Sequence, residues 1–192
     1  HTTEILGSVS LAVPGIHNVS NALAAIALCL QLQIPLDTIC RGLSKFKGTN
    51  RRFEKKGEIG GVTIIDDYAH HPQEITATLK AAQNYPHRKI WCVFQPHTYS
   101  RTKALMDDFV TALSLADEVV LADIYPARET DTLGISSSDL EEKLVKNGRS
   151  CHYFSTFDEI ENFLLENCIN GDLLITMGAG DIVKVGESLL GR

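Results

Sequence analysis

Several absences narrow what this 192-residue chain can be. It has no apolar run long enough to cross a bilayer, which argues against a membrane protein. The net charge of −6 lacks the positive excess that nucleic-acid binding usually shows. No targeting signal, internal repeat or low-complexity segment is visible. With these classes disfavoured, we expect an ordinary globular protein. The 44% hydrophobic and 22% charged residues indicate the same.

Closely spaced cysteines are also missing. The sequence has five scattered cysteines, several within apolar segments: Cys29, Cys40, Cys92, Cys151 and Cys168. This pattern is typical of free thiols in a reducing cytoplasm, not of a disulfide framework. Neither Cys-x-x-Cys nor His-Glu-x-x-His accompanies the adjacent His70 and His71. A zinc site is therefore the weaker interpretation, and we expect no metal site in this chain.

The first 48 residues form a small part of the chain with too few elements for a core of its own. The sequence predicts one strand-like stretch, Ile5–Val13, and two helices, Asn18–Leu30 and Pro35–Leu43, with Asn18 as the first N-cap. The chain also begins without a methionine. We therefore expect a fragment of a longer protein.

Residues 49–192 alternate strands and helices. Apolar and β-branched runs predict strands at 57–59, 62–66, 89–95, 118–123, 152–154 and 173–177. Helical periodicity fills the intervals at 72–84, 101–116, 137–147, 157–167 and 180–190. Gly60-Gly61 joins the first two strands into a predicted hairpin. The pattern predicts an α/β fold with a mostly parallel sheet and helices on both faces.

Polar side chains gather where four of these strands end. The clusters are Asp66-Asp67-Tyr68-Ala69-His70-His71, Gln95-Pro96-His97-Thr98-Tyr99-Ser100-Arg101-Thr102, Ile124–Glu129 and Gly178-Ala179-Gly180-Asp181. Ligands of open α/β sheets bind at the carboxyl ends of strands. Any one of these residues has a structural explanation as a helix cap or a solvated loop. The four clusters together favour a functional cleft.

Three arginines suggest an anionic ligand. Arg101 stands at a predicted helix start, where the helix dipole disfavours a cation, and a guanidinium there suits a carboxylate or phosphate. Arg51 and Arg52 follow the predicted linker, residues 46–50. A solvated pair is the ordinary explanation for adjacent arginines, and the hinge position modestly favours a phosphate contact.

Five motifs together resemble those of the Mur ligases of peptidoglycan synthesis. They are Gly15–Ala25, Gly48–Phe53, Asp66–Pro72, Phe94–Thr102 and Gly178–Asp181, in the order of the family. The resemblance implies a three-domain enzyme that binds a UDP-sugar, ATP and an incoming amino acid. Residues 1–48 would be the C-terminal remnant of its central ATP-binding domain. Residues 49–192 would be its C-terminal, Rossmann-like amino-acid-binding domain.

The resemblance also implies a reaction. ATP would phosphorylate the carboxylate of UDP-N-acetylmuramate to an acyl phosphate, and the amine of L-alanine would attack it. ATP and Mg²⁺ would be bound mainly upstream, because the chain has no Gly-x-x-Gly-Lys-Thr/Ser loop. The implied partners are UDP-N-acetylmuramate, L-alanine and ATP, with no nucleic acid and no membrane. The implied location is the cytoplasm of a bacterium.

The resemblance assigns roles to individual side chains. On the nucleotide side it implies His17, Asn18, Asn21, Arg52 and Asp67. Around the acyl phosphate and the substrates it implies Tyr68, His70, His71, His97 and Arg101. Within these sets, His70, His71 and Arg52 are the catalytic candidates, and Arg101 would pair with the alanine carboxylate. Thr98 stands where an arginine often follows Pro-His in the family, which leaves more of that carboxylate to Arg101.

Two other functions stay open. The recycling ligase that joins a preformed tripeptide to the same sugar shares an Asp-Asp-x-Ala-His-His-Pro-like motif, but we expect it to differ at Gln95–Thr102. A stand-alone module that binds a nucleotide or amino acid without chemistry is also compatible with the composition. A phosphate loop in the upstream sequence would decide for a ligase.

Overall fold

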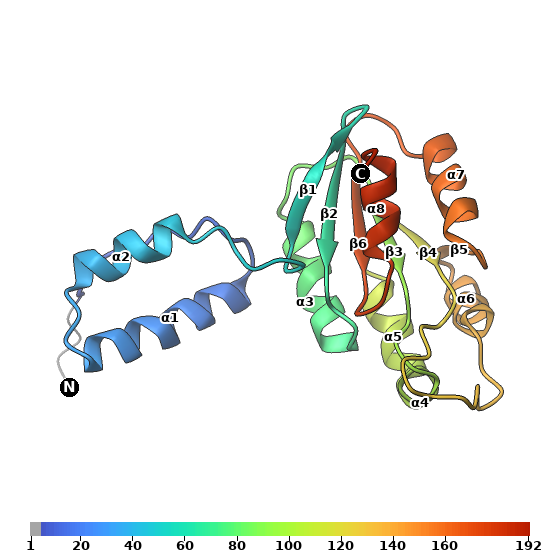
Figure 1. The fold of residues 1–192 in the computed structure, drawn as a ribbon, viewed down its shortest axis with the longest axis horizontal. Coiled ribbons are helices and arrows are strands. Elements are labelled where there is room, and N and C mark those ends of the chain that lie inside the picture. Colours follow the sequence, from blue (N-terminus) through green and yellow to red (C-terminus); the bar gives the residue numbers. More distant parts are fainter. Residues whose placement is uncertain (1–4) are drawn as a thin grey trace. The chain divides into compact units, whose positions relative to one another are not determined.

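The computed structural model describes residues 5–192, in two compact units that divide between Asn50 and Arg51 (Figure 1). The division lies two residues beyond the predicted boundary after residue 48. The assignment of the two units to two domains of a longer enzyme stays a prediction. No helix in the described residues is both long and apolar enough to span a bilayer.

The first unit contains two helices, α1 (Ile16–Gln31) and α2 (Leu36–Lys45). Both helices begin close to the predicted positions. The strand predicted at Ile5–Val13 is wrong, because these residues form irregular chain. A strand needs a neighbour to pair its backbone groups, and residues 5–50 offer none.

The start of α1 also differs from the prediction. The helix begins after Gly15, whose φ of 100° suits glycine, so its first turn includes two residues predicted to precede it. Asn18 is therefore not the N-cap. Its side-chain amide donates to the carbonyl oxygen of Pro14 at 2.6 Å, which ties the helix start to the preceding turn.

The second unit is built on a six-stranded sheet in the order β1-β2-β6-β3-β4-β5. The strands are β1 (Glu54–Ile59), β2 (Val62–Asp67), β3 (Ile90–Phe94), β4 (Glu118–Leu121), β5 (Ser150–Tyr153) and β6 (Leu173–Met177). The β1–β2 pair is the predicted antiparallel hairpin across Gly60-Gly61. All other neighbours are parallel, so the mostly parallel sheet is confirmed.

Helices cover both faces of this sheet (Figure 1). They are α3 (Pro72–Ala82), α4 (Tyr99–Ala104), α5 (Met106–Leu113), α6 (Ser137–Lys146), α7 (Phe157–Asn167) and α8 (Val183–Leu189). The single helix predicted at 101–116 is wrong, because the chain breaks at Leu105, which has φ of −115° and ψ of 22°. The break leaves a short helix, α4, whose first residues belong to the second polar cluster.

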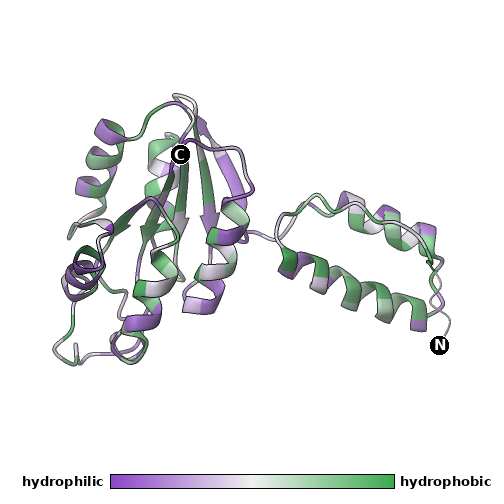
Figure 2. Ribbon diagram, turned by 180° about the vertical axis from the view of Figure 1, so that it is seen from behind, coloured by the Kyte–Doolittle hydropathy of each residue, from purple (hydrophilic) through white to green (hydrophobic). Residues whose placement is uncertain are grey.

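Side chains of β2, β3, β4 and β6 alternate between two cores. Ile65, Cys92 and Leu121 belong to the core under α3, α5 and α6. Ile64, Trp91 and Val120 belong to the core under α7 and α8. Figure 2 shows the strands mostly in apolar colour, whereas apolar and polar residues alternate along the helices. Strands of a sheet that is covered on both faces are apolar throughout. This explains why the sequence predicts these strands.

The connections place β6 at the centre of the sheet. The chain runs from β2 through β3 and β4 to β5 with helices on one face, then returns over the other face through α7 to β6. The reversal inserts β6 between β2 and β3. Such a reversal of strand order opens a crevice at the carboxyl edge of a sheet, where ligands bind.

Candidate active site

Four strands end side by side at the carboxyl edge of the sheet. The last residue of β2, Asp67, pairs with Met177 of β6, which pairs with Phe94 of β3, which in turn pairs with Leu121 of β4. The polar clusters that follow these strands therefore start at one level. The structure thus brings together the four clusters that the sequence shows as separate segments.

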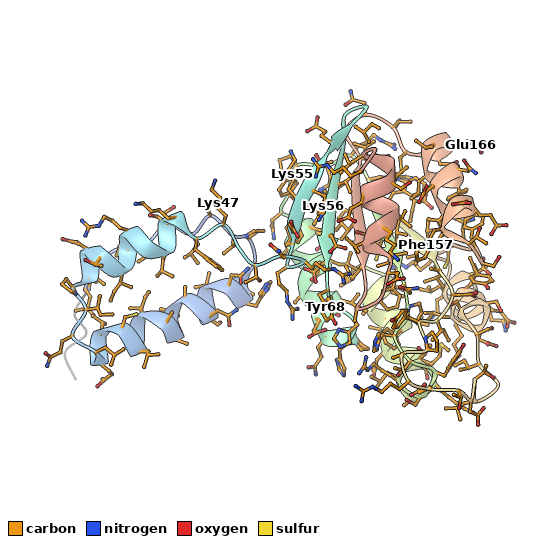
Figure 3. The ribbon with its side chains drawn as sticks, in the orientation of Figure 1. Lys47, Lys55, Lys56, Tyr68, Phe157 and Glu166 are labelled. Carbon is orange, nitrogen blue, oxygen red and sulfur yellow. The ribbon has the colours of Figure 1, made fainter. Side chains whose placement is uncertain are left out.

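Four rings from three of these clusters form a row, which we call the ring row: Tyr68, His70, His97 and Tyr125. Tyr68 contacts His70 edge to face, with ring centres 5.5 Å apart, and His70 contacts His97 in the same way at 5.7 Å. His97 stacks on Tyr125 at 5.5 Å with an angle of 19° between the planes. Tyr68 marks the row at the end of β2 (Figure 3). Tyr68, His70 and His97 are predicted site residues, whereas no role was predicted for Tyr125.

Arg101 extends the site beyond the ring row. Thr98 accepts a hydrogen bond from the Arg101 backbone N–H at 3.4 Å and so begins α4. The Arg101 guanidinium lies 3.2 Å from His97 Nδ1 and 3.4 Å from the His97 carbonyl oxygen. It forms no ion pair within residues 5–192. A charged donor that is held in place by a neutral group can still bind an anion.

The environment of His97 favours a neutral imidazole. The ring is partly buried, and burial lowers its pKa below the ordinary value. The positive charge of Arg101 lowers the pKa of His97 further. His97 can therefore give and accept hydrogen bonds without carrying a charge at neutral pH.

Arg51, for which the sequence suggested a phosphate contact together with Arg52, has a structural role in the site. Its Nε donates to the fully buried Asp66 at 2.8 Å, and its Nη2 donates to the Gly178 carbonyl oxygen at 2.7 Å. Asp66 also accepts from Thr176 at 2.8 Å. Arg51 thus ties the start of the second unit to the ends of β2 and β6. The signal that points to it is Asp66, because a buried carboxylate needs a cation close by.

Arg52, which carries the predicted phosphate and catalytic roles, has a different environment. Its side chain is exposed and its guanidinium carbon lies 5.9 Å from the centre of the Tyr68 ring. The guanidinium carbon of Arg51 is nearer to the same ring, at 4.9 Å. Arg52 therefore stands at the edge of the ring row, and its phosphate contact stays a prediction.

Asp67 is almost wholly buried, with 4% of its surface exposed. One carboxylate oxygen accepts the backbone N–H of Phe53 and the other that of Ala69, each at 2.8 Å. Burial raises the pKa of Asp67, and these hydrogen bonds oppose the rise. The structure thus gives Asp67 the role of holding the chain just before β1 and just after β2. The nucleotide contact predicted for it stays a prediction.

His71 points to a different place from the ring row. Its Nδ1 accepts the backbone N–H of Gln73 at 3.4 Å and so caps α3. The carboxylate of Glu74 accepts the backbone N–H groups of His70 and His71, at 3.1 Å and 3.3 Å. His71 also lines a surface hollow of about 350 Å³ between α3 and α5. The structure therefore does not bring His71 into the ring row.

The turn after β6 needs its glycines. Gly178 has φ of 147°, which favours glycine, and a Cβ on Gly180 would lie 2.9 Å from two ring carbons of Tyr125. Gln95, at the end of β3, accepts the backbone N–H of Asp181 at 2.9 Å. The turn thus packs closely against the neighbouring clusters, which explains a motif that is weak evidence in the sequence alone.

The remaining predicted residues, His17, Asn18 and Asn21, belong to α1 of the first unit. Their contacts with a nucleotide stay predictions. In the part of the chain that the structure describes, no group of three or more His, Cys, Asp or Glu side chains is arranged to hold a metal ion.

Comparison with known proteins identifies the family. Residues 51–180 match the family model described as "Mur ligase, glutamate ligase domain". A UDP-N-acetylmuramate–L-alanine ligase of Lachnospira eligens is 66% identical over 187 residues, which is 97% of this chain and 41% of that protein. The chain thus spans about two fifths of the length of that relative.

Two solved structures are similar. A UDP-N-acetylmuramate-alanine ligase from Thermotoga maritima has a TM-score of 0.81 at 32% identity, covering 96% of this chain and 39% of that one. A murein peptide ligase from Psychrobacter arcticus has a TM-score of 0.70 at 27% identity, covering 95% and 38%. The family model covers more than half of the chain, and it lies on the unit that carries the ring row. The chain belongs to the Mur ligase family.

Proposed function

We propose that this chain supplies the amino-acid-binding part of an ATP-dependent ligase that joins L-alanine to UDP-N-acetylmuramate in the bacterial cytoplasm. The observation that carries the proposal is Arg101, whose guanidinium lies beside His97 at the carboxyl edge of the sheet and forms no ion pair in the described chain. The α-carboxylate of an amino acid is a matching counter-ion for such a donor. The name of the Lachnospira eligens relative supports the same reaction.

The reaction depends mainly on how the amine and the acyl phosphate are positioned relative to each other. The amine of L-alanine attacks the carbonyl carbon of the acyl phosphate, the bond from carbon to the phosphate oxygen breaks, and phosphate leaves. The leaving phosphate can accept the amine proton, so no side chain has to act as a general base. In this proposal Arg101 holds the carboxylate and His97 adds a hydrogen bond, which orients the amine for attack.

Other side chains of the edge have supporting parts in the proposal. Tyr68 and His70 line the approach to the acyl phosphate, and Arg52 neutralises phosphate charge. His71 acts through its cap on α3, which fixes the loop that carries His70. His17, Asn18, Asn21 and Asp67 remain our candidates for the nucleotide side.

The described residues do not fit a Mg²⁺ site, because they hold no suitable cluster of carboxylates and imidazoles. No step of the proposal therefore passes through a metal in this chain. The sequence also contains no phosphate loop for the β- and γ-phosphates of ATP. We propose that both are held by a segment such as relatives have outside the matched two fifths of their length.

A chimera tests this function. The matched segment of the Lachnospira eligens ligase is replaced by this chain, which is 66% identical to it, so that the host supplies the rest of the enzyme. We expect ATP-dependent formation of UDP-N-acetylmuramoyl-L-alanine, detected by mass spectrometry. The unmodified host is the positive control, and the host without the segment is the negative control.

Two results would overturn the proposal. A folded chimera that forms no L-alanine product under conditions in which the host is active would show that this chain does not supply the function. Product with a preformed tripeptide, and none with L-alanine, would assign the chain to a recycling ligase.

A further inference from the structure

Tyr125 lies in the loop of residues 122–136, which connects β4 to α6. Its backbone N–H donates to the Pro96 carbonyl oxygen and its carbonyl oxygen accepts the Thr98 N–H, each at 2.9 Å. Tyr125 thus forms an isolated parallel bridge with His97. The bridge fixes the backbone of Tyr125 beside that of His97, although neither residue belongs to a strand.

The side chain of Tyr125 is confined as well. Its ring stacks on the His97 imidazole with 19° between the planes. The same ring comes so close to Gly180 that a Cβ there would lie 2.9 Å from two of its carbons. The His97 ring therefore lies against an aromatic plane that is itself held by the turn after β6.

Arg101 determines which nitrogen of His97 carries the proton. A guanidinium only donates hydrogen bonds, so His97 Nδ1, 3.2 Å from Nη1, accepts one. An imidazole that accepts at Nδ1 is neutral and carries its proton on Nε2.

The groups around His97 favour the neutral state on balance. They are Arg101 on α4, His70 after β2, and Glu129 and Tyr125 in the 122–136 loop. Burial lowers the pKa of His97, the charges of Arg101 and His70 lower it further, and Glu129 and the His97 backbone oppose them. Glu129 is itself engaged by the N–H and hydroxyl groups of Ser100.

We propose that Tyr125 is a positioning residue that, together with Arg101, holds His97 as a neutral imidazole with its Nε2–H directed to the amino-acid substrate. The substrate in this statement rests on the proposed function, whereas the tautomer and its dependence on Tyr125 do not. His97 then donates a hydrogen bond and does not act as a general base.

Proton–nitrogen correlation spectra of the 192-residue chain with labelled histidine test the tautomer. His97→Gln assigns the His97 signals. We expect one Nε2–H tautomer and a titration below the ordinary histidine value. An Nδ1–H tautomer, or a charged imidazole at neutral pH, would overturn the proposal.

Two substitutions separate positioning from packing. Tyr125→Leu keeps an apolar side chain between Gly180 and His97 but removes the aromatic plane, so we expect a mixture of tautomers and a titration closer to the ordinary value. Tyr125→Phe should restore the single tautomer. Phe163→Leu, on α7 at the other face of the sheet, is the matched control, because it removes a ring beside another histidine, His152, and it should leave the His97 signals unchanged. Unchanged His97 signals in Tyr125→Leu would overturn the role of Tyr125.

Kinetics of the chimera test the substrate separately. We expect Tyr125→Leu to raise KM for L-alanine by roughly tenfold while KM for ATP stays within about twofold. The expected spectra with no L-alanine activity in the chimera would refute the proposed function alone. Activity with an unchanged KM for L-alanine would refute the positioning role.

Discussion

At the scale of single residues, charge and burial decide which side chains hold the site together and which are left for a ligand. Arg51 and Arg52 are neighbours in the sequence, yet only Arg51 pairs with a buried carboxylate, that of Asp66. Burial raises the pKa of Asp66, and the hydrogen bond from Arg51 opposes the rise. Arg101 has a neutral partner and keeps its charge available.

The two neighbouring arginines give a matched pair of variants. Arg51→Met leaves the Asp66 carboxylate buried without its cation, so we expect the free energy of unfolding to fall by about 3 kcal/mol. Arg52→Met removes an exposed charge and should change it by less than about 0.5 kcal/mol. Urea unfolding of the chain measures both. Equal effects of the two substitutions would contradict the structural role of Arg51.

Because the pKa of His97 is lowered in the folded chain, we expect the free energy of unfolding to depend on pH. The unfolded chain binds a proton at His97 more readily than the folded chain does, so protonation favours unfolding. The stability contribution is complete above the unfolded pKa, near 6.5, and is lost as the pH falls from there to the folded pKa. His97→Gln should flatten the stability profile in that interval, measured by urea unfolding at a series of pH values. A variant with the same pH slope as the original chain would exclude His97 as its source.

At the scale of elements, the sequence predicts well where packing on both sides dictates composition. The runs Val62–Ile65 and Leu173–Met177 are apolar because both faces of their strands are buried. The same logic fails at Ile5–Val13, since an apolar run becomes a strand only when a neighbour pairs with it. The break at Leu105 is also invisible, because helical periodicity continues across it.

The sequence predicts part of the candidate site, as it predicts part of the fold. His70, His97 and Arg101 could be found because polar residues at the ends of apolar strands are conspicuous in a sequence. Tyr125 belongs to the third of the polar clusters, Ile124–Glu129, but nothing in the sequence singles it out, because its position depends on a bridge to His97. The capping role of His71 arises from the geometry of α3, which the sequence alone left open.

A substitution in the turn after β6 tests how tightly this turn packs against the ends of the neighbouring strands. Gly180→Ala would press a methyl group into the Tyr125 ring and the Gln95 amide, so we expect a loss of about 1–3 kcal/mol in stability. Gly42→Ala is the control, because Gly42 lies within α2 and a Cβ added there would have no atom within 4 Å. That change should stabilise the helix by up to about 1 kcal/mol. Thermal unfolding compares the two, and a neutral Gly180→Ala would contradict the close approach.

At the scale of the whole molecule, the two units have different means of staying folded. The second unit has two cores, one on each face of its sheet, whereas residues 5–50 of the first contain two helices and no strand. The ring row and Arg101 lie in the second unit, whereas the sequence contains no Gly-x-x-Gly-Lys-Thr/Ser loop for the phosphates of ATP. The proposed substrate site and the proposed source of chemical energy are thus in different parts of the enzyme.

We therefore expect the chain alone to fold but not to turn over. The second unit should unfold cooperatively, whereas ATP hydrolysis should not exceed background, because phosphoryl transfer depends on positioning and charge neutralisation around the phosphates. Calorimetry and a phosphate-release assay on the isolated chain measure these properties. Turnover above background would mean that the chain holds a complete catalytic site.

The central claim is that the carboxyl edge of the sheet binds the amino acid through Arg101. The most direct test is the steady-state kinetics of the chimera with Arg101→Ala, with Lys103→Ala on the same helix as control. Loss of a charge-assisted pair of about 2–3 kcal/mol predicts a KM for L-alanine raised roughly 30- to 150-fold. The KM for ATP should not change, and Lys103→Ala should resemble the parent. An unchanged KM for L-alanine together with a raised KM for ATP would contradict the claim.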